Sequence, residues 1–376
     1  MKNIVLYLKA AIIFSLLFFT SCKEDEPKNP KEEISRTVLV YMAGENNLSY
    51  YATLNVDSIL VGMNKVEKPI NFLVFEDKKS LAPNLWKIEK DLNGNSVKTL
   101  VKTYTEFNSV DPQKMKDVIN EVFSKYNANE KCLILWSHGT AWLPSNNYTL
   151  PSAPVQRSFG QDNANYLEIW DLRKVLEGTP YLDLLIFDAC FMSSAETLYE
   201  LKDAAKTIIA SPTEILGAGF PYQVVVPYLN ETTLDPKKIC TGYMSFYNGY
   251  KFDGTISLID CNYLDELAAV YKKVLDGADY SNISESAIQE FGRREPNFLN
   301  DFYDMENVVE VINPALLPEF KAVMGKVVKY NNYTKLFLNL EINRCCGISV
   351  FVPQLNTNST YNKAYTALKW HEAVYE

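Results

Sequence analysis

A chain of 376 residues has room for one large α/β domain or two modest ones, and a composition of 47 % hydrophobic and 22 % charged residues is typical of a globular protein with a core. The net charge of −9 and the lack of a basic stripe disfavour a nucleic-acid partner, because binding phosphates requires lysines and arginines. With only two histidines and no Cys-x-x-Cys pair, the sequence predicts no metal site of the zinc type.

The N-terminus has the anatomy of an export signal. Lys2 supplies a positive start, and residues 4–19 are almost wholly apolar. The following Phe19-Thr-Ser-Cys22 resembles the lipobox of bacterial lipoproteins, in which the cysteine becomes the first mature residue and is acylated. We therefore expect a signal peptide over residues 1–21 and a lipid anchor at Cys22 that holds the protein on a membrane of the cell envelope, in the outer membrane or at the cell surface. The alternative is an ordinary secretory signal with a chance cysteine.

Residues 22–35 are charged, contain prolines and lack apolar anchors, which is typical of a flexible tether. The folded domain is then expected over residues 36–376. Its cysteines are expected to be buried thiols rather than disulfides. Cys132 lies inside an apolar run, and the adjacent Cys345 and Cys346 would rarely bridge each other.

Apolar runs alternate with amphipathic stretches along the folded part, which predicts a three-layer α/β domain with a mostly parallel sheet. The expected strands are 37–43, 71–76, 85–89, 97–104, 133–138, 184–188, 207–210, 255–260 and 347–353, with a hairpin turn at 93–94. The expected helices are 49–64, 111–126, 166–177, 193–205, 263–275, 301–311 and 314–330. The stretch 222–235 is a weak candidate for a boundary between subdomains.

Two strand ends carry reactive side chains. One apolar run ends in Ser-His138-Gly139, and another ends in Asp188-Ala-Cys190. The separation of 52 residues (190 − 138) leaves room for a loop and a crossover helix, so in one parallel sheet His138 and Cys190 would emerge at the same edge. A thiol beside an imidazole predicts a cysteine nucleophile with its base, favoured further by the N-terminus of the helix that follows Cys190. The N–H groups of Gly139 and Cys190 are the natural oxyanion donors. The alternatives are a structural histidine and a buried cysteine.

These motifs resemble the clostripain family of cysteine peptidases, which are relatives of caspases, gingipains, legumain and separase. The resemblance covers most of the region from Arg36 to Pro353. It implies a caspase-like α/β/α sandwich and a Cys190/His138 dyad that needs no third acid and acts on peptide or protein substrates. The motifs that carry it are Thr37-Val-Leu-Val-Tyr-Met-Ala43, Trp136-Ser-His-Gly139, Phe187-Asp-Ala-Cys-Phe-Met192, Ala210-Ser-Pro-Thr-Glu214, Asp301-Phe-Tyr-Asp304 and Gly347-Ile-Ser-Val-Phe-Val-Pro353.

Family members usually cleave after Arg or Lys, so the resemblance implies that Asp188 binds a basic substrate side chain. The alternative is that Asp188 only caps backbone N–H groups at its strand end. Glu214 is a second candidate, although the stretch after it is more apolar than the acidic loop of the family. Related peptidases are often activated by self-cleavage between the histidine and the cysteine. Arg157 is the only basic residue within 139–171, so a basic-specific self-cleavage would follow it. The alternative is an ordinary surface loop.

Some relatives depend on calcium, for which Asp301, Asp304 and Glu306 are candidate ligands despite lacking the Asp-x-Asp-x-Asp-Gly pattern. No other metal or cofactor is expected. His371, in a terminal helical stretch, is expected to be solvated. The sequence thus predicts an exported, lipid-anchored cysteine endopeptidase. Two alternatives are a binding lipoprotein that has lost activity on the same fold, and an amidase or transpeptidase that uses the same thiol.

Overall fold

A nine-stranded sheet forms the centre of the computed structural model, which describes residues 34–145, 158–281, 283–284, 286–292 and 301–376. Cys22 and Arg157, the residues of the expected lipidation and self-cleavage, lie outside the described residues. Residues 34–376 form one compact unit. Within the described ranges, no helix has the length and apolar character needed to cross a membrane.

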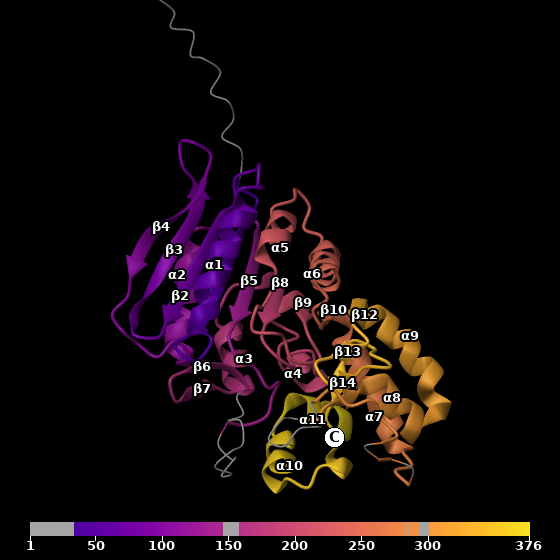
Figure 1. Cartoon of the computed structure of the whole chain (residues 1–376). Coiled ribbons are helices and arrows are strands. Elements are labelled where there is room, and N and C mark those ends of the chain that lie inside the picture. The colour runs from indigo at the N-terminus through magenta and orange to yellow at the C-terminus, as the bar shows by residue number, and fades with distance from the viewer. Residues whose placement is uncertain (1–33, 146–157, 282, 285, 293–300) are drawn as a thin grey trace, which may run out of the picture. The chain divides into compact units, whose positions relative to one another are not determined.

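The strands of this sheet follow the order β12-β10-β9-β8-β5-β1-β2-β3-β4 (Figure 1). The five central strands run parallel, whereas each outer strand is antiparallel to its neighbours. The prediction of a mostly parallel sheet in a three-layer α/β domain is therefore confirmed. The central strands are β1 (Arg36–Gly44), β2 (Asn71–Lys78), β5 (Glu130–Trp136), β8 (Leu182–Asp188) and β9 (Ala205–Ala210). The outer strands are β3 (Leu81–Lys90), β4 (Ser96–Thr103), β10 (Thr255–Asp260) and β12 (Val328–Tyr333).

Helices cover both faces of the sheet, because successive side chains of a strand point to opposite faces. Along β1, Val38, Val40 and Met42 belong to one core cluster, while Leu39 and Tyr41 belong to the other. The first cluster lies under α1 (Ser49–Met63), α5 (Tyr222–Leu229) and α6 (Pro236–Tyr250). The second lies under α2 (Pro112–Lys125), α3 (Ile169–Glu177), α4 (Ala195–Glu200) and α7 (Leu264–Asp276).

Local signals fix several of these elements as expected. Asp111 caps α2 by accepting the N–H groups of Gln113 at 3.0 Å and Lys114 at 2.9 Å. The turn between β3 and β4 contains Gly94 with a φ of +82°, a conformation that glycine adopts without steric cost. The hairpin predicted at residues 93–94 is therefore confirmed.

The stretch 222–235, suggested as a subdomain boundary, instead contains α5 and leads into α6. The three valines of α5 favour a strand and Pro227 favours the end of a helix, so the sequence does not predict a helix here. Tertiary packing decides the outcome, because α5 lies closely against α1. A Cβ added to Gly62 of α1 would lie 2.6 Å from the carbonyl oxygen of Tyr222.

The helix expected over 314–330 is shorter than predicted. It divides into η2 (Pro314–Leu316) and α9 (Leu317–Val327), and the chain then forms the outer strand β12, which pairs with β10. The strand expected over 347–353 is also shorter: β15 (Ser349–Val350) pairs with β11 (Tyr303–Asp304) and forms one parallel bridge with Ser194, outside the main sheet. Both differences arise from pairing with distant strands, which local patterns do not report.

Three expected helices begin or end elsewhere. The helix expected over 166–177 starts at Ile169, because Asn165–Leu167 form a small hairpin strand. The helix over 301–311 starts later, since Asp304 caps it by accepting the N–H of Asn307 at 2.9 Å. The helix over 193–205 is reduced to α4. The remaining described elements are β6 (Phe159–Asp162), β7 (Asn165–Leu167), η1 (Cys261–Tyr263), α8 (Met305–Ile312), β13 (Leu336–Phe337), β14 (Leu340–Glu341), η3 (Pro353–Leu355), α10 (Ser359–Tyr365) and α11 (Lys369–Tyr375).

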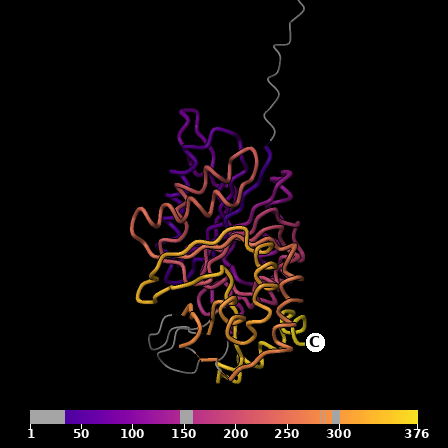
Figure 2. The backbone as a smooth tube through the Cα atoms, turned by 90° about the vertical axis from the view of Figure 1, so that its right-hand side faces the viewer, coloured from indigo at the N-terminus to yellow at the C-terminus, as the bar shows by residue number. Residues whose placement is uncertain are grey.

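The C-terminal part of the chain adds to one end of the sheet. Helix α9 and strand β12 lie at the opposite end from β3 and β4 (Figure 1), on the side that faces the viewer in Figure 2. No disulfide joins the cysteines of the described residues, and most of these thiols are buried, as expected. The buried ones are Cys132, Cys240, Cys261 and Cys345.

Candidate active site

The two reactive residues follow neighbouring parallel strands at matched positions. Strand β5 pairs with β8 so that Trp136 faces Asp188, an offset of 52 residues (188 − 136). His138 and Cys190 have the same offset, and each lies two residues beyond the last paired position. The N–H of Ser137 continues the pairing by donating to the carbonyl oxygen of Asp188 at 3.4 Å. The two strand ends therefore emerge at one edge of the sheet, as the spacing predicts.

Gly139 allows these two strand ends to approach closely. A Cβ at this position would lie 2.6 Å from the Cys190 carbonyl oxygen and 3.1 Å from the Met192 sulfur, so a side chain here would force the backbones apart. Gly139 also forms an isolated antiparallel bridge with Phe159, and the hydrogen bonds of this bridge come from neighbouring residues. The Gly139 N–H is therefore not consumed by the bridge and remains suited to bind an oxyanion.

The Cys190 thiol is partly buried and lies against the loop that follows β9. Its sulfur accepts the N–H of Ile215 at 3.3 Å and lies 3.6 Å from the Ile215 carbonyl oxygen. A backbone N–H that donates to sulfur favours the thiolate. The next residue, Phe191, has a φ of +62°, a left-handed conformation that a non-glycine residue adopts only when its surroundings impose it. This sharp turn directly follows the thiol, two residues beyond the end of β8 at Asp188.

The helix that follows Cys190 stabilises the thiolate less than the sequence suggests. Helix α4 has only six residues and begins at Ala195, five residues after Cys190. Its N-cap Ser194 accepts the N–H of Thr197 at 3.2 Å, which uses one of the free helix donors. The Ile215 N–H, which reaches the sulfur directly, is the clearer source of thiolate stabilisation.

His138 is oriented by a residue that sequence reasoning missed. Its Nε2 lies 2.6 Å from the side-chain oxygen of Asn47, in the turn after β1. An amide oxygen only accepts hydrogen bonds, so the tautomer that matches this contact carries its proton on Nε2 and has Nδ1 as the basic nitrogen of the neutral ring. Asn47 belongs to the polar turn Glu45-Asn46-Asn47, and its place after a central parallel strand is the signal that could have identified it.

Asp188 is buried, 4 % exposed, and holds the loop after β9 in place. Its Oδ2 accepts the N–H of Phe220 at 3.0 Å and the hydroxyl of Tyr222 at 2.9 Å. Burial raises the pKa of Asp188 to about 6, and these two hydrogen bonds only partly offset that rise. No described residue donates a hydrogen bond to Oδ1, so the carboxylate retains capacity to accept from a substrate.

These residues line one cavity of about 170 Å³. Its walls include His138, Cys190 and Asp188, together with Glu214 and Gly219 from the loop after β9. Gly219 has a φ of +66°, and an added Cβ would lie 2.8 Å from Asp188 Oδ2, so only glycine leaves the carboxylate accessible. The structure thus brings the thiol, the imidazole and both expected acids together, with Glu214 partly exposed.

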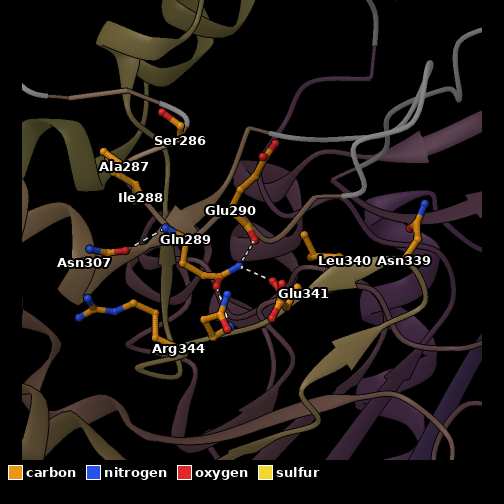
Figure 3. Close-up of a pocket in the computed structure, with 11 residues that line it drawn as sticks. Ser286, Ala287, Ile288, Gln289, Glu290, Asn307, Asn339, Leu340, Glu341 and Arg344 are labelled. Carbon is orange, nitrogen blue, oxygen red and sulfur yellow. Dashed lines mark hydrogen bonds between the residues drawn. The ribbon is translucent and has the colours of Figure 1, made fainter.

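A wider cavity of about 470 Å³ lies elsewhere and contains neither reactive residue (Figure 3). The N–H of Gln289 donates to the side chain of Asn307 at 2.8 Å, and the Gln289 amide donates to the carbonyl oxygens of Glu290 at 2.8 Å and Glu341 at 3.1 Å. Polar groups around Gln289 in this cavity therefore form hydrogen bonds with one another. The smaller cavity remains the candidate active site, because it combines a thiol, an imidazole and a buried carboxylate.

The acids expected to bind calcium already have protein partners. Asp304 accepts the N–H of Cys346 at 2.6 Å in addition to capping α8, and Glu306 forms an ion pair with Lys321 at 3.2 Å. Asp301 accepts a hydrogen bond from the Asn356 side chain. Among the described residues, the carboxylates that cluster closely enough to share an ion are a different set, Glu45, Asp77 and Glu106.

His371 is only partly solvated, whereas the sequence predicts a solvated side chain. Its ring stacks on Tyr375 with a centroid distance of 4.6 Å and meets the edge of Tyr365 at 5.3 Å. Burial lowers the pKa of His371. This histidine belongs to the packing of the C-terminal helices and is no part of the candidate active site.

A thiol and an imidazole at matched ends of adjacent parallel strands, in a three-layer sandwich, define the arrangement of caspase-like cysteine peptidases. The chain belongs to the clostripain family, whose model matches residues 40–375. It is 26 % identical over 225 residues to clostripain of Hathewaya histolytica. That match spans 53 % of this chain but only 42 % of clostripain.

Solved structures of C11 cysteine proteases have the same fold. A secreted C11 cysteine protease from Bacteroides thetaiotaomicron, in complex with an irreversible peptide inhibitor, is 31 % identical with a TM-score of 0.79, covering 90 % of this chain and 98 % of that one. An inactive zymogen C11 protease from Parabacteroides distasonis is also 31 % identical with a TM-score of 0.79, covering 92 % of this chain and 99 % of that one. The caspase-like fold expected from the sequence is therefore confirmed.

Proposed function

We propose that this protein is an exported cysteine endopeptidase in which Cys190 is the nucleophile and His138 its base. The observation that carries the proposal is the shared offset of the two residues beyond β5 and β8, in one cavity that Asp188 also lines. Membership of the clostripain family and similarity to a C11 protease in complex with a peptide inhibitor support it.

The proposed mechanism assigns one role to each residue of the cavity. His138 Nδ1 takes the proton of the Cys190 thiol, and the thiolate attacks the substrate carbonyl carbon. The N–H groups of Gly139 and Cys190 stabilise the resulting oxyanion. The protonated His138 then donates its proton to the leaving amine as the C–N bond breaks, which leaves a thioester on Cys190. Water attacks this thioester with His138 again as base, and the acid product leaves as the thiol regains its proton. Throughout, Asn47 holds Nε2 and keeps the ring oriented.

The specificity proposed is for Arg or Lys on the acyl side of the cleaved bond. Asp188 would accept from the guanidinium or ammonium group through Oδ1, while Oδ2 keeps its two bonds within the protein. A buried carboxylate that binds a cation is a strong and selective contact. Glu214 would add negative potential at the partly exposed side of the cavity.

The direct test compares fluorogenic peptides that differ only in Arg, Lys or citrulline before the cleaved bond. Citrulline has nearly the shape of arginine without the charge, so it isolates the role of Asp188. We expect kcat/KM for Arg to exceed that for citrulline at least about a hundredfold, and Cys190→Ala to abolish all turnover. Hydrolysis of none of the three by the wild-type chain would refute the peptidase proposal, and equal rates for Arg and citrulline would refute the specificity alone.

Anchoring and activation are further parts of the proposal. We propose that Cys22 is acylated and that the mature protein is held at the cell envelope by this lipid. We also propose self-cleavage after Arg157; a relative from Parabacteroides distasonis was solved as an inactive zymogen, which is consistent with an activation step. Mass spectrometry should find a cut after Arg157 in the wild type and an intact chain in Cys190→Ala and Arg157→Ala. A cut that persists in Cys190→Ala would contradict self-cleavage. Cys22→Ala should release the protein from membranes.

A further inference from the structure

A buried amide on α1 joins β5 to the loop after β9, which comprises residues 211–221. Asn55 is 4 % exposed; its Oδ1 accepts the indole N–H of Trp136 at 2.8 Å, and its Nδ2 donates to the carbonyl oxygen of Ala218 at 2.9 Å. An indole N–H only donates and a carbonyl oxygen only accepts, so these two neighbours fix the orientation of the amide. A buried amide is costly unless it is hydrogen-bonded, and both of these partners lie outside α1. Asn55 therefore connects two distant segments.

The two segments that Asn55 connects form walls of the candidate active site. Trp136 and Asp188 are paired residues of β5 and β8, so their side chains point to the same face of the sheet. Both line the catalytic cavity, as does Gly219, which follows Ala218. A Cβ added to Gly219 would lie 2.8 Å from Asn55 Oδ1 and 2.8 Å from Asp188 Oδ2. The amide therefore joins one wall of the cavity to the other, close to the carboxylate that we propose to bind the basic side chain.

A second helix holds the next carbonyl group of the same loop. The buried hydroxyl of Tyr247, on α6, donates to the Gly219 carbonyl oxygen at 2.9 Å. Helices α1 and α6 cover the same face of the sheet (Figure 1). Side chains of two helices thus hold the successive carbonyl groups of Ala218 and Gly219, and Asp188 accepts the N–H of Phe220 at 3.0 Å. Three consecutive residues of this cavity wall are therefore fixed by buried hydrogen bonds.

The first half of the loop, which reaches the thiol, is held by different groups. The buried hydroxyls of Ser211 and Thr213 contact the Thr255 hydroxyl of β10 at 2.6 Å and 2.8 Å. Ile215, whose N–H donates to the Cys190 sulfur, follows two residues after Thr213. The loop thus has two separate sets of anchors. One set supports the contact with the thiol, and Asn55 and Tyr247 belong to the other.

We propose that Asn55 is a positioning residue that sets the width of the cavity beside Asp188, and thereby the affinity for a substrate with Arg or Lys before the cleaved bond. Tyr247 assists by holding the adjoining carbonyl group. Neither residue is among the described residues that line the cavity, so each acts through the groups that it holds. The inference rests on the proposed peptidase function, because it concerns how that site selects its substrate. It predicts that substitutions at Asn55 and Tyr247 weaken substrate binding and leave the chemistry of the thiol intact.

Saturation kinetics of Cys190 labelling by a peptidyl Lys-chloromethylketone separate binding from chemistry in the purified full chain. The concentration for half-maximal labelling reports binding, and the limiting rate reports the reaction of the thiol. We expect this concentration to rise at least about tenfold in Asn55→Leu and about threefold in Tyr247→Phe, because each variant loses hydrogen bonds that hold the cavity wall. The limiting rate should change by less than about twofold. Iodoacetamide, which has no basic side chain, should label Cys190 at the parent rate in both variants.

Asn71 provides a matched control, because it is another buried amide, 6 % exposed, at the start of β2 and far along the strands from the catalytic edge. Its Nδ2 donates to the Thr37 hydroxyl at 3.1 Å, so Asn71→Leu should lower the unfolding temperature and leave half-maximal labelling unchanged.

Unchanged half-maximal labelling in both Asn55→Leu and Tyr247→Phe would overturn the inference. An equal rise in Asn71→Leu, or a limiting rate that falls while half-maximal labelling stays constant, would overturn it as well. If Asn55→Leu does not fold, Tyr247→Phe decides the matter, since it removes a single oxygen atom. Absence of both labelling and peptide hydrolysis in the parent would instead refute the peptidase proposal, and the inference with it.

Discussion

Replacing Asp188 with asparagine should make the protein more stable and less active on basic substrates. Asparagine keeps the shape of the side chain and an oxygen that can accept from the Phe220 N–H and the Tyr222 hydroxyl. What it removes is a charge that is buried and only partly compensated. The protein would thus keep a destabilising group because the group binds substrate.

The magnitude follows from the pKa. Burial moves the pKa of Asp188 from 3.8 to about 6, so the folded protein binds this proton more tightly than the unfolded chain. A carboxyl group with a raised pKa lowers the free energy of unfolding as pH rises from about 3.8 to about 6, and the full cost is about 3 kcal/mol at pH 7.5. The same relation gives about 1.6 kcal/mol at pH 5. Asp188→Asn should therefore gain up to about 3 kcal/mol at pH 7.5 and roughly half as much at pH 5.

Chemical denaturation at pH 7.5 and pH 5 measures this difference, with Cys190→Ala in both proteins to prevent self-digestion. In the active background, Asp188→Asn should lose at least about a hundredfold in kcat/KM for Arg peptides and retain its rate on citrulline peptides. Equal destabilisation by Asp188→Asn at both pH values would show that the carboxylate only holds the loop after β9. An unchanged kcat/KM for Arg peptides in Asp188→Asn would refute the specificity role that we assign to Asp188.

Three further substitutions probe the geometry of the site. Gly139→Ala should lower kcat about a hundredfold, because its Cβ would lie 2.6 Å from the Cys190 carbonyl oxygen. Labelling of the Cys190 thiol by a Lys-chloromethylketone should slow in parallel. An unchanged labelling rate would count against the close approach of the two strand ends. Asn47→Ala should lower kcat about tenfold, because it removes one hydrogen bond to His138. Asn47→Asp retains an acceptor and should recover most of the rate. Equal kcat values for the two variants would argue against the orienting role of Asn47. Glu214→Gln should change kcat/KM for Arg peptides by less than about tenfold, because the Glu214 carboxylate is partly solvated. A larger loss would mean that Glu214 binds the substrate more strongly than its partial exposure predicts.

The centre of the fold could be predicted because its signals are local and strong. Strands buried on both faces are continuous apolar runs, and the residues that end them stand out by polarity alone. The 52-residue spacing between His138 and Cys190 equals the register offset of β5 and β8, so the sequence contained the alignment of the two reactive residues. What it could not supply was the pairing of β12 with β10, since that strand forms only against a distant partner.

The partners of the reactive residues depend on loop conformations that no periodicity reports. Asn47 lies in a polar turn where any of several side chains could have faced His138. The Ile215 N–H reaches the thiol only because the loop after β9 folds back over Cys190. The left-handed conformation of Phe191 is imposed by its surroundings and has no sequence signature in a phenylalanine.

The pairing of β5 with β8 has a consequence for the integrity of the chain. His138 and Cys190 are held together by backbone hydrogen bonds between two strands, by the close approach at Gly139 and by the cores on both faces of the sheet. The strand-to-strand hydrogen bonds join β5 to β8 directly and do not run through the segment between them. We therefore expect that a single cut in this segment would turn one polypeptide into two while His138 and Cys190 stayed side by side.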